Sequence, residues 1–216
     1  MMKALTKEQI SSNYEEFKSI VKSIQRDGIE NLIEWLDTTD FAYAPASTKY
    51  HSNFEGGLCK HSLNVYHTMM KLKNDYCPEI SDESCKIVAL FHDIAKVNFY
   101  EEYAQNKKVY SPNGSKYDEL GKFDWVAVKA YRVKSDSDKE FVCHTHGVNS
   151  YMILHRFIKI TQSEATAIMN HHSGADDNFA VKDISEVLNR YPTATLLHMA
   201  DYLATFILEN PYMVNE

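Results

Sequence analysis

The chain of 216 residues is 44% hydrophobic and carries a net charge of −7, which fits one compact domain and excludes a strongly basic surface for a long nucleic acid. Its four cysteines form no CxxC pair, and a chain of this size needs no disulfides, so a reducing compartment is expected. No apolar leader and no stretch of roughly 18 apolar residues is present, so we expect a cytoplasmic protein with no membrane partner.

Apolar residues recur at helical spacing through most of the chain. This periodicity predicts helices over residues 10–24, 28–36, 58–72, 84–97, 147–160, 163–172 and 193–208. Three helix starts have signals of their own: Ser81 before two acidic residues, Ser163 before Glu164, and Pro192 before an apolar run. The fold is therefore predicted to be mainly α.

The pattern changes between residues 98 and 145. The segment "KFDWVAVKAYRVK" (122–134) alternates like a strand, "SDSDKE" is typical of a turn, and "FVCHTH" (141–146) could return as a second strand. We therefore expect a β-hairpin inserted at about 98–145. Residues 1–40 are predicted to form an N-terminal helical extension packed on the core, and residues 41–216 the main domain.

Four polar residues fall on apolar faces of the predicted helices: His61, His92, Asp93 and Asp201. A buried imidazole or carboxylate is costly unless it is paired or coordinated, although any one of them alone is also typical of a hydrogen-bonded core residue. A shared cation would satisfy all four. Nitrogen and carboxylate ligands together suit Fe, Mn, Ni, Co or Zn, whereas calcium alone prefers an all-oxygen shell.

The order H…HD…D resembles that of the HD-domain superfamily of metal-dependent phosphohydrolases. Here His61, then His92 with Asp93, then Asp201 match the pattern, and "HDIAK" keeps Lys96 while Ala95 replaces the glycine of the commoner HDIGK form. The resemblance covers roughly residues 44–208. It implies an HD-domain helical bundle that carries the predicted hairpin as an insertion.

Two closer likenesses concern shorter segments. The segment "APASTKYHSNFEGGLCKHSLNVY" (44–66) is similar to the stretch before the first metal histidine in YhaM-type 3′-to-5′ exoribonucleases. Those enzymes carry an oligonucleotide-binding barrel ahead of the HD domain, whereas about forty helical-looking residues stand there in this chain. The paired histidines of "MNHHSGADD" resemble those of HD-GYP cyclic-dinucleotide phosphodiesterases, but no Gly-Tyr-Pro follows.

Superfamily members with two metals have further histidines between the HD pair and the last aspartate. The resemblance assigns these positions to His146, which should open a helix, and His171, which should close one, with His172 as the reserve ligand. Asp93 would then bridge the two ions. His144 is the less favoured half of "HTH". The other histidines are expected to be surface or core residues, with His198 near the edge of the site: His67, His155 and His198.

Four further features are candidates for contacting substrate. Lys96 is either a phosphate-binding charge or a solvated lysine at a helix end. His51 is either a group that protonates the leaving oxygen or contacts substrate, or a surface loop residue. The glycine pair before residue 58 would let the backbone approach a ligand. Basic and aromatic residues of the hairpin could grip a nucleotide or form a solvated strand face: Lys107, Lys108, Lys116, Lys129, Arg132 and Lys134 with Tyr110, Tyr117, Phe123, Trp125 and Tyr131.

The predicted function is hydrolysis of a phosphomonoester or phosphodiester. One or two divalent transition metal ions, held by the predicted ligands, would activate water and neutralise phosphoryl charge. Asp93, Lys96 and His51 are the predicted catalytic residues. The expected partner is a small phosphorylated substrate, a nucleotide or the end of a short RNA or DNA. The same ligands would serve a di-iron HD-domain oxygenase. A nucleotide-sensing HD module without catalysis is a third hypothesis, disfavoured because the ligand set is complete.

Overall fold

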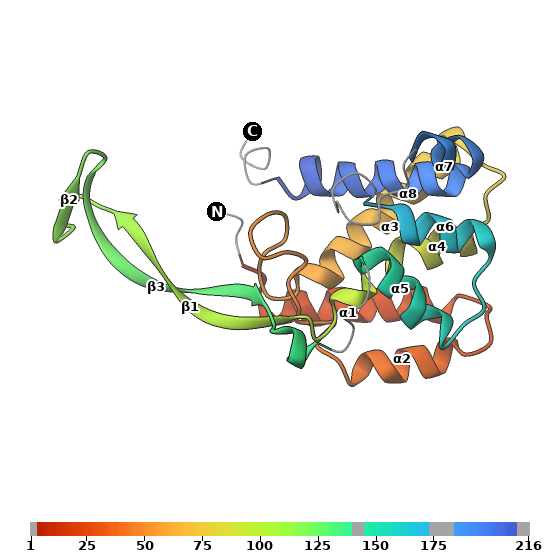
Figure 1. Ribbon diagram of the computed structural model, residues 1–216, viewed down its shortest axis with the longest axis horizontal. Coiled ribbons are helices and arrows are strands. Elements are labelled where there is room, and N and C mark those ends of the chain that lie inside the picture. Colours follow the sequence, from red (N-terminus) through yellow and green to blue (C-terminus); the bar gives the residue numbers. More distant parts are fainter. Residues whose placement is uncertain (1–3, 140–144, 173–183, 211–216) are drawn as a thin grey trace.

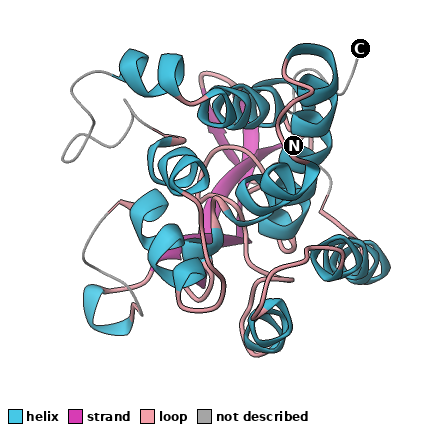
Figure 2. Cartoon of the chain, turned by 90° about the vertical axis from the view of Figure 1, so that its right-hand side faces the viewer, coloured by secondary structure: helices cyan, strands magenta, loops and turns pink. Residues whose placement is uncertain are grey.

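The computed structural model describes residues 4–139, 145–172 and 184–210. It consists of a body of helices from which one long β-ribbon projects (Figure 1). Figure 2 shows the helices grouped side by side, with the strands running away behind them. The α-helices are α1 (Lys7–Lys22), α2 (Ile29–Asp37), α3 (Gly57–Tyr76), α4 (Asp82–Phe91), α5 (His146–His155), α6 (Gln162–Asn170), α7 (Ile184–Arg190) and α8 (Pro192–Leu203). The mainly α prediction is thereby confirmed.

The helices begin where capping side chains are available. Ser81 caps α4 through the Ser84 backbone N–H, and Pro192 is the first residue of α8, as predicted. The predicted start of α6 at Ser163 was wrong, because Thr161 is the cap. Its hydroxyl accepts from the Glu164 backbone N–H while the Glu164 carboxylate accepts from the Thr161 N–H.

One hydrophobic core joins the helices of the body. The N-terminal helices belong to it, since Phe17 of α1 is fully buried and its ring lies 4.6 Å from Phe41 and 5.7 Å from Phe91 of α4. Helix α3 packs against α1, α4 and α8, and α6 packs against α5 and α8. The ends of α3, α4, α5, α6 and α8 are therefore held in one rigid frame. None of the described helices is long and apolar enough to cross a membrane.

Several helix ends differ from the sequence prediction. Helix α4 ends at Phe91 rather than continuing to residue 97, and a 3₁₀ turn follows at Ile94–Lys96. Helix α5 ends at His155 rather than 160, where the Phe157 carbonyl packs so close to Gly28 that no Cβ fits there. Helix α8 passes into a π-helical turn, Ala204–Leu208. Helix α7 was not predicted.

The predicted hairpin insertion is present, but its strand pairing was predicted wrongly. Strand β3 (Gly121–Val133) pairs antiparallel with β1 (Tyr100–Tyr110) along its length and with the short β2 (Lys116–Asp118) near its start. We call this projecting ribbon the arm (Figure 1). β1 was missed because its charged and polar residues do not alternate with apolar ones. Of the expected return strand 141–146, residues 141–144 lie outside the described part and His146 begins α5.

Candidate metal centre

The structure brings the four residues of the predicted primary shell together inside the helical body. His61 Nε2 lies 3.1 Å from Asp201 Oδ1, 3.3 Å from His92 Nε2 and 3.8 Å from Asp93 Oδ2. His92 Nε2 lies 3.4 Å from Asp93 Oδ2. All four side chains are buried, with at most 2% of each residue exposed. Ligands of one ion with metal–ligand distances near 2.1 Å are separated by about 3 Å, so these spacings suit one coordination sphere.

The early end of α4 explains how two adjacent residues serve the same site. On a continuous α-helix, neighbouring side chains point about 100° apart. The helix ends instead at Phe91, and Asp93 has φ −108° and ψ 13°, in the bridge region between α and β. His92 and Asp93 therefore both turn toward His61. The cost of breaking the helix is reduced because His92 Nδ1 lies 2.8 Å from the Ala89 carbonyl.

Hydrogen bonds at the far side of three histidines fix which nitrogen carries the proton. Nδ1 of His92 faces the Ala89 carbonyl, Nδ1 of His171 lies 2.7 Å from the Ile168 carbonyl, and Nδ1 of His61 lies 3.0 Å from Glu209 Oε1. Carbonyl and carboxylate oxygens only accept, so each Nδ1 is a donor and each Nε2 is the nitrogen directed to the site. Nitrogen atoms that face one another at about 3 Å repel unless a proton or a metal ion lies between them. The donor set therefore fits a metal ion.

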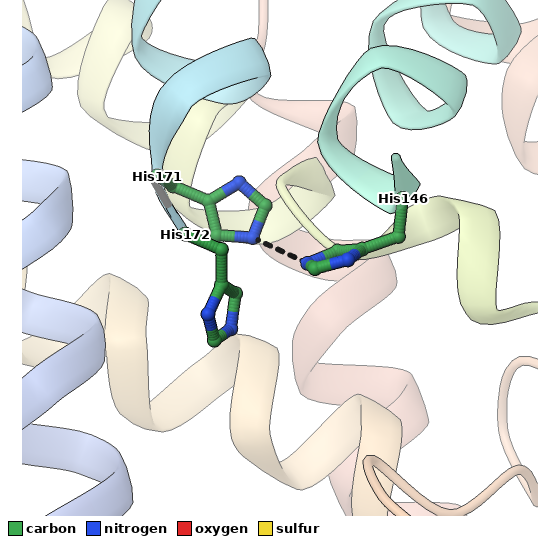
Figure 3. Close-up of side chains that lie close together, drawn as sticks. All are labelled: His146, His171 and His172. Atoms are coloured by element: carbon green, nitrogen blue, oxygen red, sulfur yellow. Dashed lines mark hydrogen bonds between the residues drawn. The ribbon is translucent and has the colours of Figure 1, made fainter. Parts of the chain in front are cut away.

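A second cluster adjoins the first through the same aspartate. His146, the first residue of α5, and His171, which caps the end of α6, place their Nε2 atoms 3.1 Å apart (Figure 3). Each Nε2 lies 3.5 Å from Asp93 Oδ1. Among the described residues this buried oxygen has no hydrogen-bond partner. Asp93 thus turns one oxygen to each cluster, as a bridging carboxylate would.

His172, the reserve ligand, also lies at this cluster. Its ring centroid is 4.8 Å from that of His146 and 4.9 Å from that of His171 (Figure 3), and its Nε2 is 3.7 Å from Asp201 Oδ2. Burial lowers the pKa of His171 and of His172 to about 4 each. Both rings are therefore neutral near pH 7 and keep a lone pair for a ligand role.

The buried charges around the site do not balance. Three carboxylates, Asp93, Asp201 and Glu209, are buried with one ammonium, that of Lys96. Burial opposes a charge on His61, yet the Glu209 and Asp201 carboxylates outweigh it and raise the pKa of His61 to about 10. The site thus favours added positive charge, which one divalent ion would supply.

Burial excludes the solvent-exposed alternatives for Lys96 and His51. Lys96 is 8% exposed and its Nζ lies 2.7 Å from Asp93 Oδ2, so it is not a solvated helix-end lysine. His51 is not a surface residue either: both of its ring nitrogens are buried without a hydrogen-bond partner in the described structure. Its ring centroid lies 4.6 Å from that of His61. Burial lowers the pKa of His51 to about 3.

Other candidate residues lie elsewhere or have other partners. Gly57 faces the Ser52 carbonyl, where a Cβ would lie 2.0 Å away, so the glycine packs against its own loop rather than against a ligand. His67 is exposed and bonded to Glu16, and His198 Nδ1 contacts the His171 carbonyl at the edge of the site. His155 is exposed, and His144 lies outside the described residues.

In the arm, several cations are already paired with acidic side chains. Lys108 pairs with Asp118, and Lys129 with Glu102 at 2.7 Å. Arg132 pairs with Glu101 at 2.6 Å. These pairs favour the interpretation of the arm as a solvated strand surface over that of a nucleotide grip.

One residue of the site was not found from the sequence. Glu209 is 1% exposed and bonds to His61, but its position follows a stretch of exposed apolar residues and no spacing rule connects it to the other ligands. Its only signal in the sequence is an acidic residue eight positions after Asp201 at the end of an apolar run.

Comparison with protein families identifies an HD domain at residues 58–205, more than half of the chain. The chain therefore belongs to the HD-domain family, within the superfamily of metal-dependent phosphohydrolases. No match is found among curated proteins or solved structures. The closer likeness to YhaM-type exoribonucleases stays a prediction.

Proposed function

We propose that this protein hydrolyses a phosphate ester of a nucleotide or of a short nucleic acid end, with one or two divalent transition metal ions bound at the candidate centre. One observation carries the proposal. His61 Nε2 lies 3.1 Å from Asp201 Oδ1, 3.3 Å from His92 Nε2 and 3.8 Å from Asp93 Oδ2, and Nδ1 of both histidines is bonded away from the site. Such a set of nitrogen and carboxylate ligands is suited to bind a cation.

The residues divide into two sets of ligands. His61, His92, Asp201 and Oδ2 of Asp93 would hold the first ion. His146, His171 and Oδ1 of Asp93 would hold a second, with His172 beside them. Divalent ions in such a pair supply Lewis acidity, lower the pKa of water and offset charge on phosphoryl oxygens.

Two side chains beside the centre would act on the substrate. Lys96 holds Asp93 in place through its ion pair and brings a positive charge next to the site, where it would attract a phosphoryl oxygen. His51 has one N–H donor and one acceptor without partners in the described structure. Because its pKa is low, the ring is neutral near pH 7, so we favour hydrogen bonding to substrate over protonation of the leaving oxygen.

The test combines metal analysis with a substrate panel. The purified protein is stripped, reloaded separately with manganese, iron, nickel, cobalt or zinc, and assayed for phosphate release from nucleotides, cyclic nucleotides and short RNAs. We expect at least one metal to bind and to support hydrolysis. Iron-dependent oxygen uptake without phosphate release would reject the hydrolase and favour the di-iron oxygenase. Nucleotide binding without turnover under any metal would favour the sensing module.

A further inference from the structure

Glu209 lies outside the predicted ligand set, yet it is the most fully hydrogen-bonded carboxylate at the centre. Its Oε1 accepts from His61 Nδ1 at 3.0 Å and from Asn64 Nδ2 at 2.9 Å. Its Oε2 accepts from the Ser52 hydroxyl at 2.6 Å. A buried carboxylate that accepts three hydrogen bonds is held rigidly, and it holds its three donor side chains in place in turn.

The π-helical turn after α8 explains how Glu209 reaches this position. Eight residues along a regular α-helix turn through about 800°, which would leave Glu209 about 80° away from the direction of Asp201. The Glu209 N–H instead bonds to the Ala204 carbonyl at 2.9 Å, five residues back. In this wider turn each residue rotates less, which returns Glu209 toward the face that carries Asp201. Asp201 and Glu209 then contact opposite nitrogens of the same imidazole, that of His61.

We infer that Glu209 is a positioning residue of the metal centre: by accepting the Nδ1 proton of His61 it holds Nε2 toward the ion and makes that nitrogen a stronger ligand. This inference rests on the proposed function, because it assigns His61 to a metal. Carboxylates that accept from metal-bound histidines fix the tautomer and the ring orientation, and their loss typically weakens metal binding.

The same carboxylate connects His61 to the loop that carries His51. Ser52, which donates to Glu209, follows His51 and has a strained φ of 43°, in the left-handed region. Glu209 therefore connects helix α3, which carries His61, and the loop that carries His51 to the π-helical turn after α8. We expect both the metal and the His51 ring to depend on this contact.

The test compares Glu209→Gln and Glu209→Ala with wild type. Gln keeps the shape and one acceptor oxygen but loses the charge, whereas Ala loses the acceptor oxygens as well as the charge. Manganese affinity is measured by competition with a chelator, and the tautomer of His61 by its imidazole nitrogen chemical shifts in the zinc-loaded protein, where Nε2 is the expected ligand and Nδ1 the expected donor. We expect manganese affinity to fall by about 10–100-fold in Glu209→Ala and by less in Glu209→Gln. The nitrogen chemical shifts of His61 should show a smaller fraction of the Nδ1-protonated tautomer in both variants.

Glu164→Gln is the matched control, because Glu164 is an equally buried carboxylate whose hydrogen-bond partners are Arg26, Ser84 and Thr161. We expect this variant to unfold more easily yet to bind manganese as wild type does. Unchanged affinity and tautomer in both Glu209 variants would overturn the positioning role and leave the proposed function intact. Wild-type protein that binds no metal would overturn both. Equal loss of affinity in Glu164→Gln would show that the effect is general destabilisation and would reject the role of Glu209.

Discussion

The Oδ1 atom of Asp93 lies 3.5 Å from Nε2 of His171, although one residue follows the end of α4 and the other caps the end of α6. Each helix ends at a candidate ligand, His92 or His171, and in each case the Nδ1 of that histidine contacts a carbonyl three residues back. The same local device thus directs His92 and His171 to opposite oxygens of one carboxylate.

Asp93 is therefore the residue that the two proposed ligand sets share. We predict that Asp93→Asn loses bound metal and phosphate release together, because the amide cannot supply two anionic ligand oxygens and leaves Lys96 buried without its partner. Metal content after reloading and activity are measured on the same sample. Asp118→Asn in the arm is the control and keeps both. A metal content equal to wild type in Asp93→Asn would contradict the assignment.

The number of ions separates His171 from His172. We predict that His171→Ala lowers the metal ratio from about two toward one, since its Nε2 faces both His146 and Asp93. His172→Ala should leave the ratio largely intact, because the His172 Nε2 faces Asp201 Oδ2 at 3.7 Å, in the first proposed ligand set, rather than Asp93. The ratio is measured after saturation with manganese or iron. A wild-type ratio of one would leave the mononuclear site only.

Metal removal should weaken the fold, since the ion offsets the charge of buried carboxylates. A ligand at a hundred times its Kd stabilises a protein by about 2.7 kcal/mol. For a chain of this size we expect excess chelator to lower Tm by about 5–10 °C, and manganese to restore it. Thermal unfolding with and without chelator measures this. Equal melting temperatures would speak against an ion coupled to the buried cluster.

Helical periodicity was sufficient to predict the helical body, because most helices bury one apolar face. It failed where the apolar pattern continues although the backbone is no longer α-helical. Ile94 and Val97 are buried as if α4 went on, but the helix has ended at Phe91. The 3₁₀ turn that follows packs against α5, where the Ala95 N–H donates to the Ser150 hydroxyl at 3.1 Å, and no local pattern encodes this contact.

The part of the candidate site that depends on residue type and on order along the chain was predictable from the sequence. The structure brings together the predicted ligands His61, His92, Asp93, His146, His171 and Asp201. Glu209 was missed because it reaches the site through a π-helical turn, and helical spacing rules assume a regular turn. The burial of Lys96 and of the ring nitrogens of His51 likewise arises from the packing of neighbouring segments, so sequence alone left their alternatives open.

Acid should remove one source of stability that is independent of the metal. Burial raises the pKa of Glu164, but hydrogen bonds from Arg26, Thr161 and Ser84 outweigh it and hold that pKa below its usual 4.5. A lowered pKa in the folded state stabilises the protein above the unfolded-state pKa, and this is lost as pH falls through the folded value.

We therefore predict that Glu164→Gln is less stable than wild type by about 1–3 kcal/mol at pH 7, and that the difference shrinks between about pH 5 and pH 3. Urea unfolding with chelator present measures both proteins, so that the carboxylates of the metal centre contribute equally and cancel. A difference that stays constant or grows in acid would show that the Glu164 charge does not stabilise the fold.

The arm offers the final prediction, because its outer part contributes nothing to the core of the body. Among residues 106–127 only Phe123 is buried, and the ring contacts of Phe123 are with Tyr110 and Trp125 of the arm itself. Gln105 and Val128 are directly opposed in β1 and β3. Replacing residues 106–127 by Asn-Gly should therefore close the shortened ribbon with a two-residue turn.

We expect this shortened protein to keep its metal content and to unfold within about 2 °C of wild type, since a projecting two-stranded ribbon adds little stability of its own. The KM for a nucleotide that wild type hydrolyses should also be unchanged, because Lys108, within the deleted segment, is already paired with Asp118. A higher KM with normal metal content would instead show that the arm contacts the substrate, as its mixture of lysines and aromatic rings would allow.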